Sequence, residues 1–233
     1  MSIYFVTALL SPRSGDSFRP IYKYIQHFHE LAESRIPIGV YLDESLRDHT
    51  DIICGRYSNV TILDYVSADT SFIPSDTVIP RNRNIKKDTA EYMAIQLMKL
   101  ALCAKAATDS RITASHIAWI DFGILHMIRD KAGVTKFLLD YCPPSRCDKI
   151  LNPGCWEKGN YNIWDSIAWR FCGSFLVGPR HSWAPALAAQ QKVVFEGLPR
   201  LTWEVNYWTM MEDVFEWYKA DHNDSIILNL PTS

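Results

Sequence analysis

The stretch HIAWIDFG, residues 116–123, does most to decide the fold of this chain. Its apolar run ends abruptly at Asp121, and Phe122 and Gly123 follow. A short apolar run that stops at a turn signal is typical of a strand buried on both faces of a parallel sheet. In open α/β sheets, ligands bind outside the carboxyl ends of such strands. The stretch therefore predicts an α/β fold and places a candidate site at Asp121.

The rest of the chain alternates β-rich runs with helical patterns, which predicts βαβ units and a mixed, mainly parallel sheet flanked by helices. The expected strands cover residues 3–10, 36–42, 59–63, 116–120, 148–152, 170–177 and 225–230. The expected helices cover residues 18–32, 88–107, 182–196 and 204–218. We expect Asp88 to cap the second helix, with Glu91 completing a capping box. The long polar connection at residues 64–87 is of a kind that is usually functional or mobile.

Composition narrows the class of protein without naming a function. The chain has 233 residues, 48% of them hydrophobic, which predicts one domain with a core of its own. The net charge of −2 argues against an electrostatic surface for nucleic acid or anionic membranes. No apolar stretch approaches the roughly 18 residues of a membrane span. We expect a cytoplasmic protein whose six scattered cysteines are reduced thiols.

Asp121 is the first candidate for chemistry. A carboxylate at the end of a buried strand is costly unless it meets a cation or several hydrogen bonds. Mg²⁺ and Mn²⁺ are commonly held by one or two carboxylates together with substrate phosphates. Asp121 is therefore a candidate metal ligand and catalytic residue. The alternative is that Asp121 caps the next helix, since Gly123 also suits a tight turn.

Four segments, in this order and spacing, resemble the HtrL/YibB-type family of glycosyltransferases. They are VTAL at residues 6–9, the segment from Arg81 to Thr89, WIDFGI at residues 119–124 and FCGSF at residues 171–175. The similarity runs from about residue 3 to residue 217. This family is related in kind to GT-A sugar-nucleotide enzymes, including those with which large DNA viruses decorate their capsids.

The resemblance implies a single GT-A-like domain over residues 1–233, with a nucleotide-binding half at residues 1–125 and an acceptor-binding half at residues 126–233. Asp121 would be the first acid of the DxD motif that holds Mn²⁺ or Mg²⁺, and Gly123 stands in place of the second acid. Such a site has a single direct carboxylate, or it works without tight metal binding. The implied donor-binding residues are Thr7, Ala8, Arg13, Arg81, Lys86, Asp88, Trp119, Phe122, Gly123, Gly173 and Ser174.

A basic segment lies just before the expected helix at residue 88. It contains Arg81, Arg83, Lys86 and Lys87. Arginine and lysine offset the negative charge that develops on a leaving diphosphate. The helix would add backbone N–H donors at its start. We favour Arg81 and Lys86 as donor-binding residues, and a solvated basic loop is the alternative.

Transfer with inversion needs a base that takes the proton of the acceptor hydroxyl, and a carboxylate at a pocket edge suits this task. Glu204 lies in the aromatic segment LTWEVNYW, residues 201–208, and is our candidate base. Asp165 and Asp213 are second choices. The alternative is that Glu204 is a carboxylate favoured at a helix start by the macrodipole.

Seven of the eight tryptophans follow residue 150. Their rings suit sugar faces, because each offers a flat apolar surface beside one N–H donor. We expect Trp156 and Trp203 to contact an acceptor glycan, although core packing explains most of the tryptophans equally well.

These observations predict a glycosyltransferase that moves a sugar from a nucleotide diphosphate, UDP foremost, to a glycan or glycoprotein acceptor. A non-catalytic carbohydrate-binding protein and a sugar nucleotidyltransferase are the alternatives. The sequence has neither a P-loop nor a GxGxxG motif, which argues against an ATPase and a dinucleotide enzyme.

Overall fold

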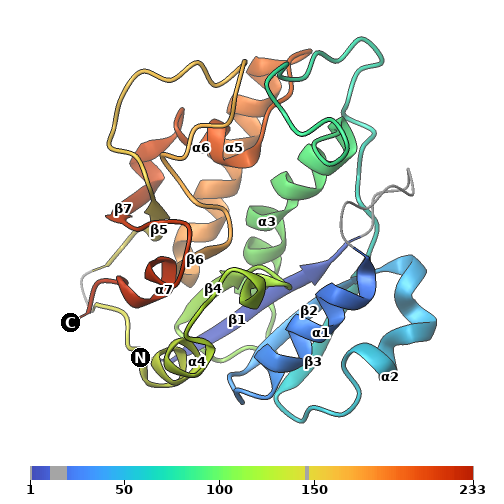
Figure 1. The fold of residues 1–233 in the computed structure, drawn as a ribbon, viewed down its shortest axis with the longest axis vertical. Coiled ribbons are helices and arrows are strands. Elements are labelled where there is room, and N and C mark those ends of the chain that lie inside the picture. Colours follow the sequence, from blue (N-terminus) through green and yellow to red (C-terminus); the bar gives the residue numbers. More distant parts are fainter. Residues whose placement is uncertain (1, 11–19, 145–146, 233) are drawn as a thin grey trace.

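One mixed sheet runs through the protein, whose computed structural model describes residues 2–10, 20–144 and 147–232 (Figure 1). Its seven strands are ordered β3-β2-β1-β4-β6-β5-β7. They are β1 (Ile3–Leu9), β2 (Ile38–Asp43), β3 (Val60–Val66), β4 (His116–Ile120), β5 (Ile150–Gly154), β6 (Phe175–Pro179) and β7 (Phe215–Lys219). Strand β6 runs antiparallel to β4 and β5, and the other pairings are parallel. The expected mixed, mainly parallel sheet is confirmed.

Helices cover both faces of this sheet. They are α1 (Ile21–Ala32), α2 (Thr50–Ile53), α3 (Ala90–Thr108), α4 (Lys131–Asp140), α5 (Trp183–Gly197), α6 (Glu204–Trp208) and α7 (Ser225–Leu228). Short 3₁₀ turns are η1 (Glu44–His49), η2 (Ile124–His126), η3 (Arg180–Ser182) and η4 (Glu212–Val214). Apolar residues of α1, α4 and α7 join one core cluster, and those of α3, α5 and α6 join the other. The sheet therefore separates two hydrophobic cores.

The strands supply both cores because their side chains alternate between the two faces. In β1, Phe5 belongs to the cluster under α1 and Val6 to the cluster under α3. Strand β4 is buried along its whole length, as its unbroken apolar run predicts. A polar residue that follows this strand must therefore lie outside the sheet, just beyond the carboxyl end of the strand.

Helix α3 begins two residues later than expected, because Thr89 is its cap and Asp88 is not. The Thr89 hydroxyl accepts a hydrogen bond from the Tyr92 N–H over 3.1 Å. Asp88 turns back instead, and its Oδ2 accepts the N–H of Asn84 over 3.0 Å. The carboxylate thus closes the loop before α3 and leaves the helix start to the threonine.

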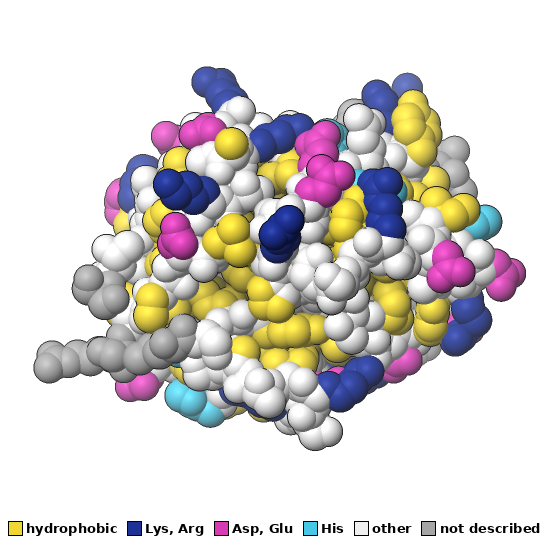
Figure 2. All heavy atoms as spheres, turned by 90° about the horizontal axis from the view of Figure 1, so that it is seen from below, with side chains coloured by type: hydrophobic (Ala, Val, Ile, Leu, Met, Phe, Trp, Pro, Cys, Tyr) yellow, Lys and Arg dark blue, Asp and Glu magenta, His cyan; other side chains and the backbone are white. Residues whose placement is uncertain are grey.

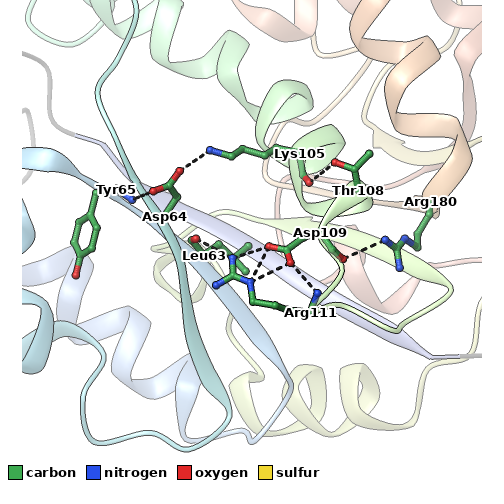
Figure 3. Close-up of polar contacts among 8 residues, drawn as sticks. All are labelled: Leu63, Asp64, Tyr65, Lys105, Thr108, Asp109, Arg111 and Arg180. Carbon is green, nitrogen blue, oxygen red and sulfur yellow. Dashed lines mark hydrogen bonds and ion pairs between the residues drawn. The ribbon is translucent and has the colours of Figure 1, made fainter.

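Polar contacts fasten the other end of α3 to the sheet (Figure 3). Lys105 donates to Asp64 of β3 over 2.6 Å. Just beyond the helix, Arg111 pairs with Asp109 and also donates to the Leu63 carbonyl over 2.9 Å. From η3, Arg180 donates to the Asp109 carbonyl over 3.3 Å. These contacts hold α3 in a set position along the sheet, and this matters because the same helix carries a residue of the site.

Three expected elements near the C-terminus are wrong in part. The expected helix at residues 204–218 ends at Trp208, and residues 215–219 form β7, which pairs with β5. The expected strand at residues 225–230 is instead the short helix α7, which packs Ile226 and Ile227 into the core. The strand expected at residues 170–177 begins only at Phe175. For β7, long-range pairing with β5 overrides local propensity.

Charges of both signs share the molecular surface. On the face shown in Figure 2, acidic and basic side chains lie beside each other around a band of apolar side chains. This mixture agrees with the near-neutral net charge of −2. Within the described residues, no helix is long and apolar enough to cross a membrane.

Candidate active site

A cavity of about 800 Å³ opens where β1 and β4 end. These two strands are parallel neighbours, so their carboxyl ends meet at the same edge of the sheet. The remaining walls come from the start of α1, turn η2, the loop before α3, the first half of α3, the segment before β6, the start of α6 and His222. The site therefore joins segments that are far apart in the sequence at the edge where α/β sheets bind ligands.

Lys99 of α3 is the residue at which these segments meet. Its side chain is only 5% exposed, and its ammonium lies 2.9 Å from Glu204 Oε1 and 3.2 Å from Asp121 Oδ1. It also donates to the Gly173 carbonyl over 2.8 Å. An ammonium has three N–H donors, and three acceptors surround this one. One cation therefore binds both of the carboxylates that the sequence singles out.

Asp121 does not cap the following turn, which was the alternative role considered for it. Turn η2 begins after Gly123 without a side-chain cap. Asp121 Oδ1 instead accepts the indole N–H of Trp119 over 2.7 Å, in addition to its contact with Lys99. Its side chain stays 37% exposed, so one edge of the carboxylate faces the cavity.

A side chain at Gly173 would force the ion pair to move. A Cβ atom there would lie 2.2 Å from Glu204 Oε1 and 3.0 Å from Lys99 Nζ. The ion pair therefore passes directly over the glycine backbone, whose carbonyl also binds the ammonium. We expected Gly173 to let the donor approach closely. In the structure Gly173 lines the cavity, and its lack of a side chain leaves room for this ion pair.

Burial and the two carboxylates together shift the pKa values of Lys99 and Tyr92. Burial alone lowers the pKa of Lys99, but Asp121 and Glu204 together outweigh it, so the pKa of the ammonium is raised. Burial raises the pKa of the Tyr92 phenol, and the same two carboxylates add to the shift. Lys99 is thus a permanent cation at neutral pH, and Tyr92 is a neutral hydroxyl in the cavity wall.

Basic residues of the loop before α3 line another part of the cavity. Arg81, Arg83 and Lys87 all contribute to it. Arg83 is held in place, because it donates to the carbonyls of Pro80 over 2.8 Å and Asp88 over 3.2 Å. Arg81 is exposed and pairs with no described residue, so its guanidinium is available to an anionic ligand.

Most of the residues expected in the site do line this cavity. They are Ala8, Arg81, Asp88, Trp119, Asp121, Phe122, Gly123, Gly173, Ser174, Trp203 and Glu204. The Ser174 hydroxyl is buried and has no hydrogen-bond partner among the described residues. The nucleotide-binding and acceptor-binding halves proposed from sequence both contribute walls, although the division itself stays a prediction.

Other expected residues lie elsewhere. Thr7 is fully buried and is not among the residues that line the cavity. Lys86 and Trp156 are exposed outside the cavity. Arg13 lies outside the described residues. Of the second choices for a base, neither is a lining residue: Asp165 accepts a hydrogen bond from Asn82, which does line the cavity, and Asp213 is exposed on η4.

Sequence reasoning missed Lys99, although a signal was present. Lys99 is the single charged residue between Glu91 and Lys105 in a helix that is otherwise mostly apolar. A lysine is almost never fully buried unless it is paired. A lone charge in such a run therefore indicates an ion pair, but it does not name the partners.

The described residues fit a resident divalent cation poorly. They contain no group of three or more His, Cys, Asp or Glu side chains that could hold a metal ion. One oxygen of Asp121 is already shared by Trp119 and Lys99. A metal on the other oxygen would lie beside a fixed ammonium of like charge. The Mn²⁺ or Mg²⁺ expected from sequence stays a prediction.

No family model matches this chain, and no curated protein matches it. The resemblance to the HtrL/YibB-type family therefore stays a prediction.

Several solved structures are similar in overall architecture. Mouse xyloside xylosyltransferase 1 in its apo form is 9% identical with a TM-score of 0.43, over 94% of this chain and 85% of that one. 4-Diphosphocytidyl-2C-methyl-D-erythritol synthase from Anaerococcus prevotii is 9% identical with a TM-score of 0.45, over 94% and 89%. Rv0371c from Mycobacterium tuberculosis is 10% identical with a TM-score of 0.44, over 94% and 88%.

Proposed function

We propose that this protein is a glycosyltransferase of GT-A type that transfers a sugar from a nucleotide diphosphate to a glycan or glycoprotein acceptor. The observation that carries the proposal is the cavity itself. It combines two carboxylates joined by Lys99 with exposed basic residues, at the carboxyl ends of parallel strands. Its volume of about 800 Å³ lies in the range of small-molecule sites.

Each part of a nucleotide sugar finds a matching group in the cavity. Arg81 and Lys87 suit the diphosphate, because arginine and lysine bind phosphate oxygens. The carboxylates of Asp121 and Glu204 suit sugar hydroxyls, which donate hydrogen bonds to them. Trp203 adds an aromatic surface to the same wall. UDP is the first nucleotide to test.

Glu204 is the proposed base. Lys99 binds its Oε1, and Oε2 has no hydrogen-bond partner among the described residues. This second oxygen would accept the proton of the acceptor hydroxyl as that hydroxyl attacks the anomeric carbon and the nucleoside diphosphate leaves. A single displacement of this kind inverts the configuration at the anomeric carbon. The outcome of the reaction is therefore a direct test of the role given to Glu204.

Two other classes of protein would use a similar cavity differently. A sugar nucleotidyltransferase would join a sugar phosphate to a nucleoside triphosphate and release pyrophosphate. A carbohydrate-binding protein would bind a glycan and release nothing.

Product analysis separates these three classes. The protein is incubated with UDP-, GDP- and TDP-sugars and a mixture of acceptor glycans, and the released nucleotide is measured. We expect a nucleoside diphosphate, and Glu204→Gln should slow its release by about 10²–10⁴-fold. Release of pyrophosphate from triphosphate and sugar phosphate would replace the proposal with the nucleotidyltransferase. Glycan binding without turnover, unchanged in Asp121→Ala, would replace it with the binding protein.

A further inference from the structure

The ammonium of Lys99 fills the place between the two carboxylates of the cavity. It lies 3.2 Å from Asp121 and 2.9 Å from Glu204, and its third contact is the Gly173 carbonyl at 2.8 Å. All three of its N–H donors are therefore used inside the protein. Such an ammonium cannot swing away to admit another ion without leaving both carboxylates and the carbonyl unpaired.

The same geometry weakens the attraction of the site for a divalent ion. Two carboxylates alone carry two negative charges, whereas the two carboxylates with Lys99 carry one. An ion on the open oxygen of Asp121 would share that carboxylate with the ammonium and would be repelled by it. One carboxylate remains as a protein ligand, which is the lower limit of the one or two that commonly hold Mg²⁺ or Mn²⁺ together with substrate phosphates.

The positive charge that a diphosphate needs is present elsewhere in the cavity wall. Arg81 is exposed and pairs with no described residue. Lys87 lies 4.0 Å from Asp88 and 4.9 Å from the centre of the Tyr92 ring, so it is directed along the start of α3. Arginine binds phosphate through two parallel N–H donors, and lysine adds a point charge.

We propose that the cations of this chain replace a divalent ion in donor binding: Arg81 and Lys87 neutralise the diphosphate, and Lys99 occupies the space between Asp121 and Glu204. The inference rests on the proposed function and goes beyond it, since it concerns which groups neutralise the charge of the bound diphosphate. Lys99 is a positioning residue, because it acts through the two carboxylates. The donor then binds without Mn²⁺ or Mg²⁺.

Calorimetric titration of the wild-type protein with UDP, GDP and TDP, in EDTA and again in Mn²⁺ or Mg²⁺, tests this directly. For the diphosphate that binds, we expect Kd in EDTA to lie within about twofold of Kd with either metal ion. A Kd that either ion tightens by more than about tenfold would overturn the inference and leave the proposed function standing. If none of the diphosphates binds in any condition, the proposed function itself fails.

Two variants sharpen the result. Arg81→Ala should weaken diphosphate binding in EDTA by about tenfold or more, as expected for the loss of a charged hydrogen-bond pair. Lys192→Ala removes a cation that is 74% exposed on α5, outside the cavity, and should leave Kd unchanged. Equal affinities in all three proteins would contradict the role of Arg81.

Lys99→Met tests whether the Lys99 ammonium keeps a metal ion out of the space between the two carboxylates. Without the ammonium, the Asp121 and Glu204 carboxylates lose the cation that they share, and the variant should gain Mn²⁺ binding that the wild type lacks, measured by electron paramagnetic resonance of the free ion. A folded variant that gains none would contradict the role of Lys99. If this variant does not fold, the wild-type titration decides alone.

Discussion

The Lys99 ammonium donates a hydrogen bond to Glu204 Oε1 over 2.9 Å, although 105 positions separate the two residues in the chain. Both side chains are almost completely buried, at 5% and 6% exposure. A buried charge is tolerated when it is paired and fully hydrogen-bonded. This contact therefore joins α3 to α6 in the lining of the cavity.

Loss of Lys99 should destabilise the protein strongly. Lys99→Met leaves Glu204 buried without its partner, and breaking a buried pair in this way costs about 3–5 kcal/mol. Lys105 lies on the same helix and pairs with Asp64, but it is 54% exposed, so Lys105→Met should cost about 1 kcal/mol or less. Urea unfolding of both variants measures the difference. Equal losses would mean that the buried pair contributes no more than a surface pair.

Gly173 should not accept any side chain. In Gly173→Ala the new Cβ would lie 2.2 Å from Glu204 Oε1, so the ion pair must move. We expect a loss of stability of about 1–3 kcal/mol, as for other overpacked sites, together with loss of nucleotide binding. Gly159→Ala is the matched control, since its nearest contact would be 3.4 Å. Thermal unfolding and nucleotide titration of both variants provide the comparison, and a fully active Gly173→Ala would contradict the site.

Glu204→Gln should separate binding from chemistry. The amide oxygen can still accept the hydrogen bond of Lys99, so the fold and the nucleotide affinity should change little. Without a base, the transfer rate should fall by about 10²–10⁴-fold. Asp148→Asn, an exposed carboxylate just before β5, is the control and should transfer normally. A Glu204→Gln protein with wild-type turnover would exclude Glu204 as the base.

Cys155 should react as a thiolate near neutral pH. The Cys172 thiol lies 3.6 Å from its sulfur, and a hydrogen bond from Cys172 lowers the pKa of Cys155 from 9.0 to about 7, although burial opposes the shift. Alkylation of Cys155 by iodoacetamide should therefore rise through about pH 7. Mass spectrometry of the peptide that carries Cys155 follows the reaction.

Cys172→Ala removes the donor and should move the midpoint of this alkylation curve to higher pH. A wild-type midpoint near 9.0, or one that Cys172→Ala leaves in place, would show that the thiol pair does not set the reactivity of Cys155.

The sequence located the centre of the sheet because a strand buried on both faces leaves an unbroken apolar run. Residues 116–120 were predicted with the bounds that β4 has, and Asp121 was identified at its end for the same reason. Strand β7 was missed because its five residues become a strand only by pairing with β5, more than sixty residues earlier. Local propensity does not contain that partner.

For the site, the sequence by itself singled out Asp121, Gly173 and Glu204 as candidates, since each stands out from its neighbours. Only the tertiary structure decided that they act on one another. Lys99 is a site residue only because α3 lies against the end of β4 and the start of α6. At that point burial removes water from the ammonium, and the two carboxylates and the Gly173 carbonyl must replace it.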